Sequence, residues 1–187
     1  GAGNVIGSEQ SGHMTNIGYD LYCKMLSDEI AKLQGKTSDD PIEVTISVSD
    51  EAYIPADYIT EEEVRLEMYK KISLISSKED KYKVEEEIED RYSDMPKQVY
   101  NLTNIAYLRS ICRKAKITSV KQKNEKYEFT FCDTDFNPAS FGKADPKHKI
   151  KLDLDLKGKP KLILSLPDTP PAQKLNEIVS VSEELFN

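Results

Sequence analysis

The sequence is poor in the residues that build disulfide frameworks, metal sites and membrane spans. Its 187 residues include only three cysteines and two histidines, and no two cysteines have CxxC spacing. An odd number of widely separated cysteines argues against both a disulfide framework and a zinc site. No apolar run approaches the roughly 18 residues of a membrane span, and no secretory signal pattern is visible. We therefore expect a reduced, cytoplasmic protein without a membrane segment.

Nucleotide-binding and catalytic motifs are also missing. A P-loop needs GxxxxGK[ST], because its amides and lysine must surround the phosphates, but Gly142 and Lys143 are followed by alanine and lack the upstream glycine. His13 and His148 have neither a second ligand nor a nucleophile signature nearby, so a solvated surface histidine is the better interpretation of each. We expect no catalytic residue, no metal and no cofactor in this chain.

Charge is present in quantity and is unevenly distributed. The net charge is −7, yet residues 39–95 hold 18 acidic and 7 basic residues, whereas residues 96–161 hold 15 basic and 7 acidic ones. Such a division is typical of two solvated faces that attract each other weakly. The alternative is a surface shaped for a charged protein partner.

The first 36 residues are expected to be separate from the rest. Residues 1–12 are rich in glycine and have no apolar period, and a helix is predicted over about 13–34. The turn-forming stretch KTSDDP follows and marks a boundary. The sequence therefore predicts a loop and linker helix at 1–36 and a domain at 37–187.

Three consecutive helices with short links are predicted in the middle of the chain. Thr60 and Glu63 have the spacing of a capping box, and Ser77 and Asp80 repeat that signal more weakly. A third helix is predicted to begin at Asp94-x-Pro96 and to reach about Lys114. The apolar positions of this third helix that we expect to face inward are Val99, Leu102, Ile105, Ala106 and Cys112.

The predicted strands surround these helices. IEVTISV at 42–48 alternates apolar and polar residues, and two later hairpins are predicted around Lys123-Asn124 and around Gly158. A final helix is expected near 171–186. The fold class is therefore α+β: a layer of about three helices packed with a mainly antiparallel sheet of hairpins, with an N-terminal loop and helix as an appendage.

Two charged clusters are the candidate functional features. Residues 85–90 contain five acids in six positions, and only Ile88 in that run is expected to face the core. A solvated helix face and a recognition edge for a partner's arginines both explain the run. The second cluster is basic and spans 109–126, where Arg109, Arg113 and Lys116 could contact nucleic acid. Ordinary solvation is the favoured explanation, since the total charge opposes phosphate binding.

Several stretches resemble one known family. The run GAGNVIGSEQSG at the start has the pattern GxGNxxGxxQSG, and EEEIEDRYSDMP has the pattern ExxDR[YF]xxxP. With AYIPADYI, RLEMYKKI and LTNIAYLRSICRKAKI, they resemble the C-terminal part of the bacterial transcription-repair coupling factor (Mfd) family, in order and in spacing. The resemblance covers residues 1–132 best. The opening loop also resembles that of RecG helicase.

The resemblance implies a longer parent protein and a regulatory role for this part of it. In the family, the full protein is an ATP-driven double-stranded DNA translocase that removes stalled RNA polymerase and recruits the repair protein UvrA. Its translocation-motif loop corresponds here to Gly3, Gly7 and Gln10, with Gln10 as the coupling residue. ATP and magnesium belong to the motor domains of the parent and not to this segment.

The resemblance further implies that the C-terminal domain is noncatalytic. It is expected to clamp the N-terminal UvrB-like module of the same protein and to mask the surface that UvrA needs. Our hypothesis for the contact is the acidic run, with Glu87 and Asp90 three residues apart on one helix edge and Glu86 beside them. The alternative is a DNA-contacting accessory module that uses residues 109–126 and the lysines at 143–161.

Overall fold

The computed structural model describes residues 42–132, 136 and 150–186. The predicted loop at 1–12, with Gly3, Gly7 and Gln10, and the predicted helix at 13–34 lie outside the described residues. The boundary at 36/37 also lies outside them and stays a prediction. The described chain forms two compact units, one containing residues 50–106 and the other containing 42–49 and the described part of 107–186.

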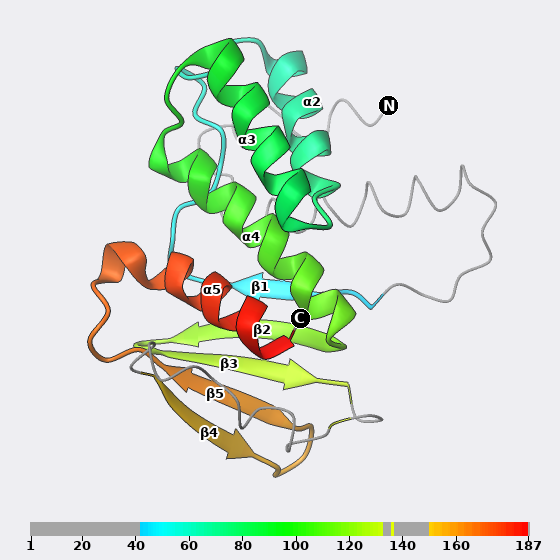
Figure 1. The fold of residues 1–187 in the computed structure, drawn as a ribbon, viewed down its shortest axis with the longest axis vertical. Coiled ribbons are helices and arrows are strands. Elements are labelled where there is room, and N and C mark those ends of the chain that lie inside the picture. Colours follow the sequence, from blue (N-terminus) through cyan, green and yellow to red (C-terminus); the bar gives the residue numbers. More distant parts are fainter. Residues whose placement is uncertain (1–41, 133–135, 137–149, 187) are drawn as a thin grey trace, which may run out of the picture. The chain divides into compact units, whose positions relative to one another are not determined.

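The first unit is built from helices. Helix α2 spans Glu62–Ser73, α3 spans Lys78–Tyr92, and the first part of α4, which spans Lys97–Lys114, completes the unit. Figure 1 shows these three helices as the successive green-toned coils that follow β1 in the chain. The predicted order of three consecutive helices is therefore confirmed. The core of this unit is formed by fully buried apolar side chains, among them Ile54, Met68, Ile72, Ile88, Leu102 and Ile105.

Of the two predicted N-terminal caps, the one at the start of α3 is present and the one at the start of α2 is not. Ser77 is the N-cap of α3, and its hydroxyl accepts a 3.1 Å hydrogen bond from the backbone N–H of Asp80, as predicted. The capping box at Thr60 is wrong, because α2 begins one residue later, with Glu61 as its N-cap and no side-chain cap. The Arg65 guanidinium instead donates to the carbonyl oxygens of Ile59 and Thr60 and ties the loop to the helix.

The second unit is a five-stranded mixed sheet with the strand order β1-β2-β3-β5-β4. Strand β1 (Thr45–Ser47) runs parallel to β2 (Ile117–Lys123), and every other pair is antiparallel. The remaining strands are β3 (Lys126–Phe131), β4 (Lys151–Asp155) and β5 (Lys161–Ser165). The α+β class and the mainly antiparallel sheet are thus confirmed, although β1 is shorter than IEVTISV suggested.

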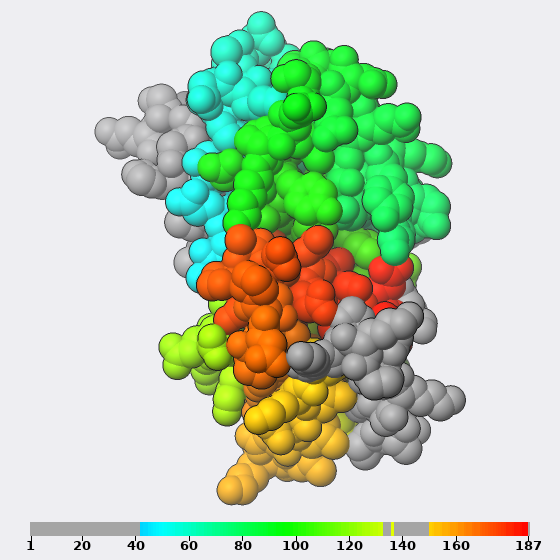
Figure 2. All heavy atoms as spheres, turned by 60° about the vertical axis from the view of Figure 1, so that its left-hand side comes forward, coloured from blue at the N-terminus to red at the C-terminus, as the bar shows by residue number. Residues whose placement is uncertain are grey.

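One face of this sheet is covered by the C-terminal helix. A short 3-10 turn at Pro171–Gln173 leads into α5 (Lys174–Phe186), which lies against the sheet in Figure 1 and forms a continuous orange-to-red surface with residues 161–173 in Figure 2. Phe186 contacts the rings of Phe129 and Phe131, with centroids 5.7 and 5.9 Å apart. Alternate residues of β3, Tyr127 and Phe129, are fully buried on this side.

The two hairpin turns use residues with positive φ. Asn124 has φ 56° between β2 and β3, and Gly158 has φ 88° between β4 and β5, as expected of Asn and Gly in tight turns. Strand β4 pairs only with β5 and so is an edge of the sheet. For this reason Leu154 and the nearby Leu156 remain 45% and 60% exposed although they alternate with polar residues as predicted.

Candidate functional site

The acidic run of α3 is divided by its helical spacing. Ile88 is completely buried in the first unit, which fixes the rotation of the helix. Glu86, Glu89 and Asp90 are exposed, and Glu87 lies at the border between core and solvent. We call Glu86, Glu87, Glu89 and Asp90 the acidic edge. It contains the three residues that the sequence singled out for partner contact.

Glu85, the first residue of the run, does not belong to this edge. It is only 8% exposed, which corrects the expectation that Ile88 alone faces the core. Its carboxylate accepts a 2.6 Å hydrogen bond from the Thr103 hydroxyl and lies 2.8 Å from the Lys81 ammonium. The Lys81 ammonium also lies over the ring of Tyr100, 4.9 Å from its centroid. Buried charges need such partners. Sequence reasoning missed this pair, although the Lys-x-x-x-Glu spacing of residues 81 and 85 could have indicated it.

Glu87 is held by two cations of its own unit. Its carboxylate accepts hydrogen bonds from Lys71 of α2 and, at 3.3 Å, from Arg91 one turn further along α3. The Lys71 hydrogen bond lowers the pKa of Glu87, and Arg91 acts in the same direction. The pKa of Lys71 is raised by the same contact. Glu87 is therefore already partly neutralised, unlike its neighbours on the edge.

Glu86, Glu89 and Asp90 present uncompensated charge. Within the described residues, no ion pair joins any of the three to a lysine or arginine. Glu86 and Asp90 are four residues apart, so they lie on adjacent turns of one helix face. Like charges at this spacing repel each other weakly, and a partner's guanidinium between them would relieve that repulsion. The acidic edge is thus a candidate contact for a basic protein surface.

The end of α3 is fixed by the residues of the ExxDRY pattern. Tyr92 packs edge-on against Tyr58, with ring centroids 6.1 Å apart. The Tyr58 hydroxyl donates a 2.7 Å hydrogen bond to the carbonyl of Ser93, which ends the helix with φ 75°. Burial raises the pKa of Tyr58, and the charges of Glu89 and Asp94 add to this effect. These contacts hold the acidic edge on a rigid helix end rather than on a loop.

The basic candidates are dispersed by the structure. Arg109 is only 7% exposed, in the buried middle of α4, whereas Arg113 at the end of that helix and Lys116 just beyond it are exposed. Lys116 adopts φ 58°, and its carbonyl accepts a hydrogen bond from the N–H of Cys132. The three cations therefore do not form one continuous surface. The sequence could not reveal this, because the apolar period of α4 does not mark Arg109 as an inward position.

Metal chemistry has no site in the part of the chain that is described. No group of histidine, cysteine, aspartate and glutamate side chains there is arranged to hold a metal ion. Cys112 is completely buried, and burial raises the pKa of its thiol. Among the same residues, no helix is long and apolar enough to cross a membrane.

The chain is similar to known proteins over most of its length. Residues 48–140 match the TRCF domain family. A transcription-repair-coupling factor of Borreliella burgdorferi is 30% identical over 95% of the chain, and one of Bacillus subtilis is 32% identical over 70%. One from Mycobacterium bovis is 36% identical over 64%. The chain spans only 11–16% of the length of these relatives.

The fold agrees with these sequence matches. A crystal structure of the C-terminal domain of transcription-repair coupling factor superposes with a TM-score of 0.69 and 24% identity, over 76% of this chain and 91% of that one. At this identity the likeness shows a shared fold. The matched domain and the relatives place the chain in the transcription-repair coupling factor family, as a segment that contains the family's C-terminal TRCF domain.

Proposed function

We propose that this chain is a noncatalytic regulatory domain that clamps the N-terminal UvrB-like module of its own full-length protein. By covering that module it masks the surface to which UvrA binds in transcription-coupled nucleotide-excision repair. The observation that carries the proposal is the acidic edge, where Glu86, Glu89 and Asp90 are exposed without an ion-pair partner in the described chain. Family membership supplies the context of repair.

A charged contact suits a clamp that must open. Charged groups at an interface set partner choice and register, and they can be separated at moderate cost because water solvates them again. An arginine of the module can bond two carboxylates at once, which favours Glu86 and Asp90 on adjacent helical turns. A wholly apolar contact of the same strength would leave an exposed, aggregation-prone apolar surface whenever the clamp opened.

Glu87 has a different place in this proposal. Because Lys71 and Arg91 already bond its carboxylate, an incoming arginine must compete with them. Glu87 therefore orients Arg91 and maintains the helix surface, while Glu86 and Asp90 make the direct contact. The proposal thereby shifts the main role from Glu87 to the pair Glu86 and Asp90.

The longer protein would supply the motor. We propose that it is an ATP-driven duplex-DNA translocase acting in the cytoplasm on stalled RNA polymerase, and that Gly3, Gly7 and Gln10 form the end of its translocation motif. The sequence of this chain has no P-loop, and in this proposal ATP and magnesium are held by the motor domains of the longer protein.

The proposal is tested by titrating the chain with the separately produced UvrB-like module in a calorimeter. We expect binding that weakens as salt is raised, because exposed charges are screened. Glu86→Lys/Asp90→Lys is expected to weaken binding by about tenfold or more, since each charged hydrogen bond contributes roughly 1.5–3 kcal/mol.

The matched control is Glu51→Lys/Asp57→Lys, which reverses the same number of exposed charges in the same unit, outside its helices. This control should bind like the wild type. Equal weakening by both variants, or no binding of the module by the wild-type chain, would refute the clamp.

A further inference from the structure

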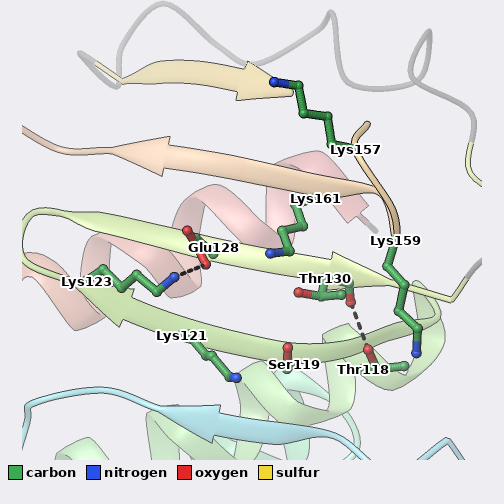
Figure 3. A pocket seen from close by; sticks show the side chains of 9 residues that line it. All are labelled: Thr118, Ser119, Lys121, Lys123, Glu128, Thr130, Lys157, Lys159 and Lys161. Atoms are coloured by element: carbon green, nitrogen blue, oxygen red, sulfur yellow. Dashed lines mark hydrogen bonds and ion pairs between the residues drawn. The ribbon is translucent and has the colours of Figure 1, made fainter. Parts of the chain in front are cut away.

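A basic groove lies on the face of the sheet that α5 does not cover. It encloses about 480 Å³ and is lined only by residues of the second unit. Figure 3 shows the side chains of Lys121, Lys123, Lys159 and Lys161 extending over this face, with α5 behind the sheet. The full lining consists of Thr118, Ser119, Lys121, Lys123, Glu128, Thr130, Lys157, Lys159 and Lys161.

Strand register explains why these residues meet. Ser119 and Lys121 of β2 pair with Thr130 and Glu128 of β3, and Thr130 pairs in turn with Lys161 of β5. Paired residues of neighbouring strands point to the same side of a sheet. Their neighbours along the strands, such as Val120 and Phe129, are buried on the opposite side, so polar residues alone remain for the groove.

The groove holds a surplus of positive charge. Its one acid, Glu128, is 3.0 Å from Lys123 and compensates that lysine. Lys121, Lys157, Lys159 and Lys161 have no ion pair with an acid of the described chain, and the first three are exposed.

Strand β4 adds two acids next to the groove, Asp153 and Asp155, which offset part of this surplus but not all of it, since five lysines line the groove. Asp155 is the register partner of Lys161 on the neighbouring strand, and its carboxylate accepts a 2.9 Å hydrogen bond from the backbone N–H of Lys157. The groove therefore has three exposed lysines, the half-buried Lys161, and the hydroxyls of Ser119 and Thr130, which can donate hydrogen bonds.

We propose that this groove binds the phosphate backbone of duplex nucleic acid without reading its sequence. Lysine ammonium groups and Ser or Thr hydroxyls are the side chains that commonly contact phosphate oxygens. A protein partner is disfavoured because such interfaces depend on aromatic or apolar anchors in pockets, and this lining contains none. Stacking on single-stranded bases is also disfavoured, because Tyr127 and Phe129 are buried on the other face.

The net charge of −7, which from the sequence alone was expected to oppose phosphate binding, has only a small effect in the groove. At physiological ionic strength, charges more than about 8 Å away are largely screened, so a phosphate in the groove experiences mainly the local lysines. The proposal is independent of the clamp, because the acidic edge belongs to the other unit. Compared with the nucleic-acid contact expected from the sequence, it omits Arg109, which is buried, and keeps Lys157, Lys159 and Lys161 from the segment 143–161.

The test is fluorescence anisotropy of a labelled 20-base-pair DNA duplex titrated with the whole chain at several salt concentrations. Four phosphate contacts predict a slope of about −3.6 for log K against log salt, or roughly a 100-fold loss of affinity between 50 and 200 mM. Lys121→Gln/Lys157→Gln/Lys159→Gln should reduce the steepness of that slope by about three.

A control variant, a check of folding and a peptide of the same charge decide the outcome. The control Lys70→Gln/Lys83→Gln/Lys97→Gln removes three exposed lysines from the other unit and should leave the slope and affinity unchanged. Circular dichroism verifies that both variants are folded. A glutamate-rich peptide of equal charge should bind more weakly than the duplex. Equal loss in both variants, no duplex binding at 50 mM salt, or tighter binding of the peptide would overturn the proposal.

Discussion

The carboxylate of Glu85 accepts a 2.6 Å hydrogen bond from the hydroxyl of Thr103, which joins α3 to α4 within the first unit. Both side chains are buried, at 8% and 0% exposure. Lys81 completes the cluster at 2.8 Å from Glu85. This buried polar cluster fixes how α3 is rotated, and it therefore determines which acids of the run reach solvent.

We predict that Thr103→Val lowers the free energy of unfolding by about 1–3 kcal/mol, because the buried carboxylate of Glu85 loses a hydrogen-bond donor. Urea denaturation followed by circular dichroism measures the change. A loss below a few tenths of a kcal/mol would show that the hydroxyl is not needed by the carboxylate.

The ion pair in the same cluster gives a sharper comparison. Lys81→Met should cost about 3–5 kcal/mol, because it leaves a buried carboxylate without its counter-charge. Replacing both partners, in Lys81→Met/Glu85→Leu, should cost clearly less, because no buried charge remains. If the double variant is the less stable of the two, the buried pair is not the reason for the cost.

The contact between Glu87 and Lys71 predicts a pH dependence. The pKa of Glu87 lies below its ordinary value of 4.5, chiefly because Lys71 donates a hydrogen bond to it. A lowered carboxyl pKa contributes stability that is present above pH 4.5 and is lost as the pH falls through the lowered pKa.

Carbon NMR of the glutamate carboxyl groups measures this titration. The midpoint of Glu87 should move up in Lys71→Met and should stay in place in Lys70→Met, which removes the neighbouring exposed lysine. A midpoint that does not respond to Lys71→Met would contradict the pairing.

Gly158 is predicted to be required for its backbone conformation alone. Its φ of 88° is unfavourable for residues with a side chain, yet a Cβ there would meet no atom within 4 Å. Gly158→Ala should therefore cost about 1–2 kcal/mol, and Gly158→Asn should cost less because Asn tolerates left-handed conformations. Thermal unfolding of both variants tests this, and equal stability of the alanine variant and the wild type would contradict it.

Much of this fold could be predicted from periodicity and turn chemistry. The inward residues of α4, the two hairpins and the Ser77 cap follow from local patterns that the tertiary structure preserves. Local patterns gave wrong predictions where contacts outside the pattern decide how a helix begins or whether a side chain is buried. Arg65 donates hydrogen bonds to the carbonyls that precede α2, in place of the predicted capping box. Glu85 can be buried because Thr103, on another helix, donates a hydrogen bond to its carboxylate.

The candidate sites show the same limit. The acidic edge could be proposed from sequence because its residues lie within five positions of one helix. For the basic groove, the sequence indicated the two lysine-containing segments but not their arrangement, because strand register brings Lys121 and Lys161 together from positions 40 residues apart. Arg109 was misleading because it lies in a buried stretch of α4, whereas Arg113 and Lys116, which the sequence grouped with it, are exposed.

The clamp is tested most directly by the affinity of the full-length protein for UvrA. If the UvrA surface is open in only a fraction of molecules, the apparent affinity is reduced by that fraction. We predict that Glu86→Lys/Asp90→Lys in the full-length protein raises its affinity for UvrA toward that of a protein lacking residues 37–187. An affinity equal to that of the unmodified protein, with both proteins folded, would contradict the account.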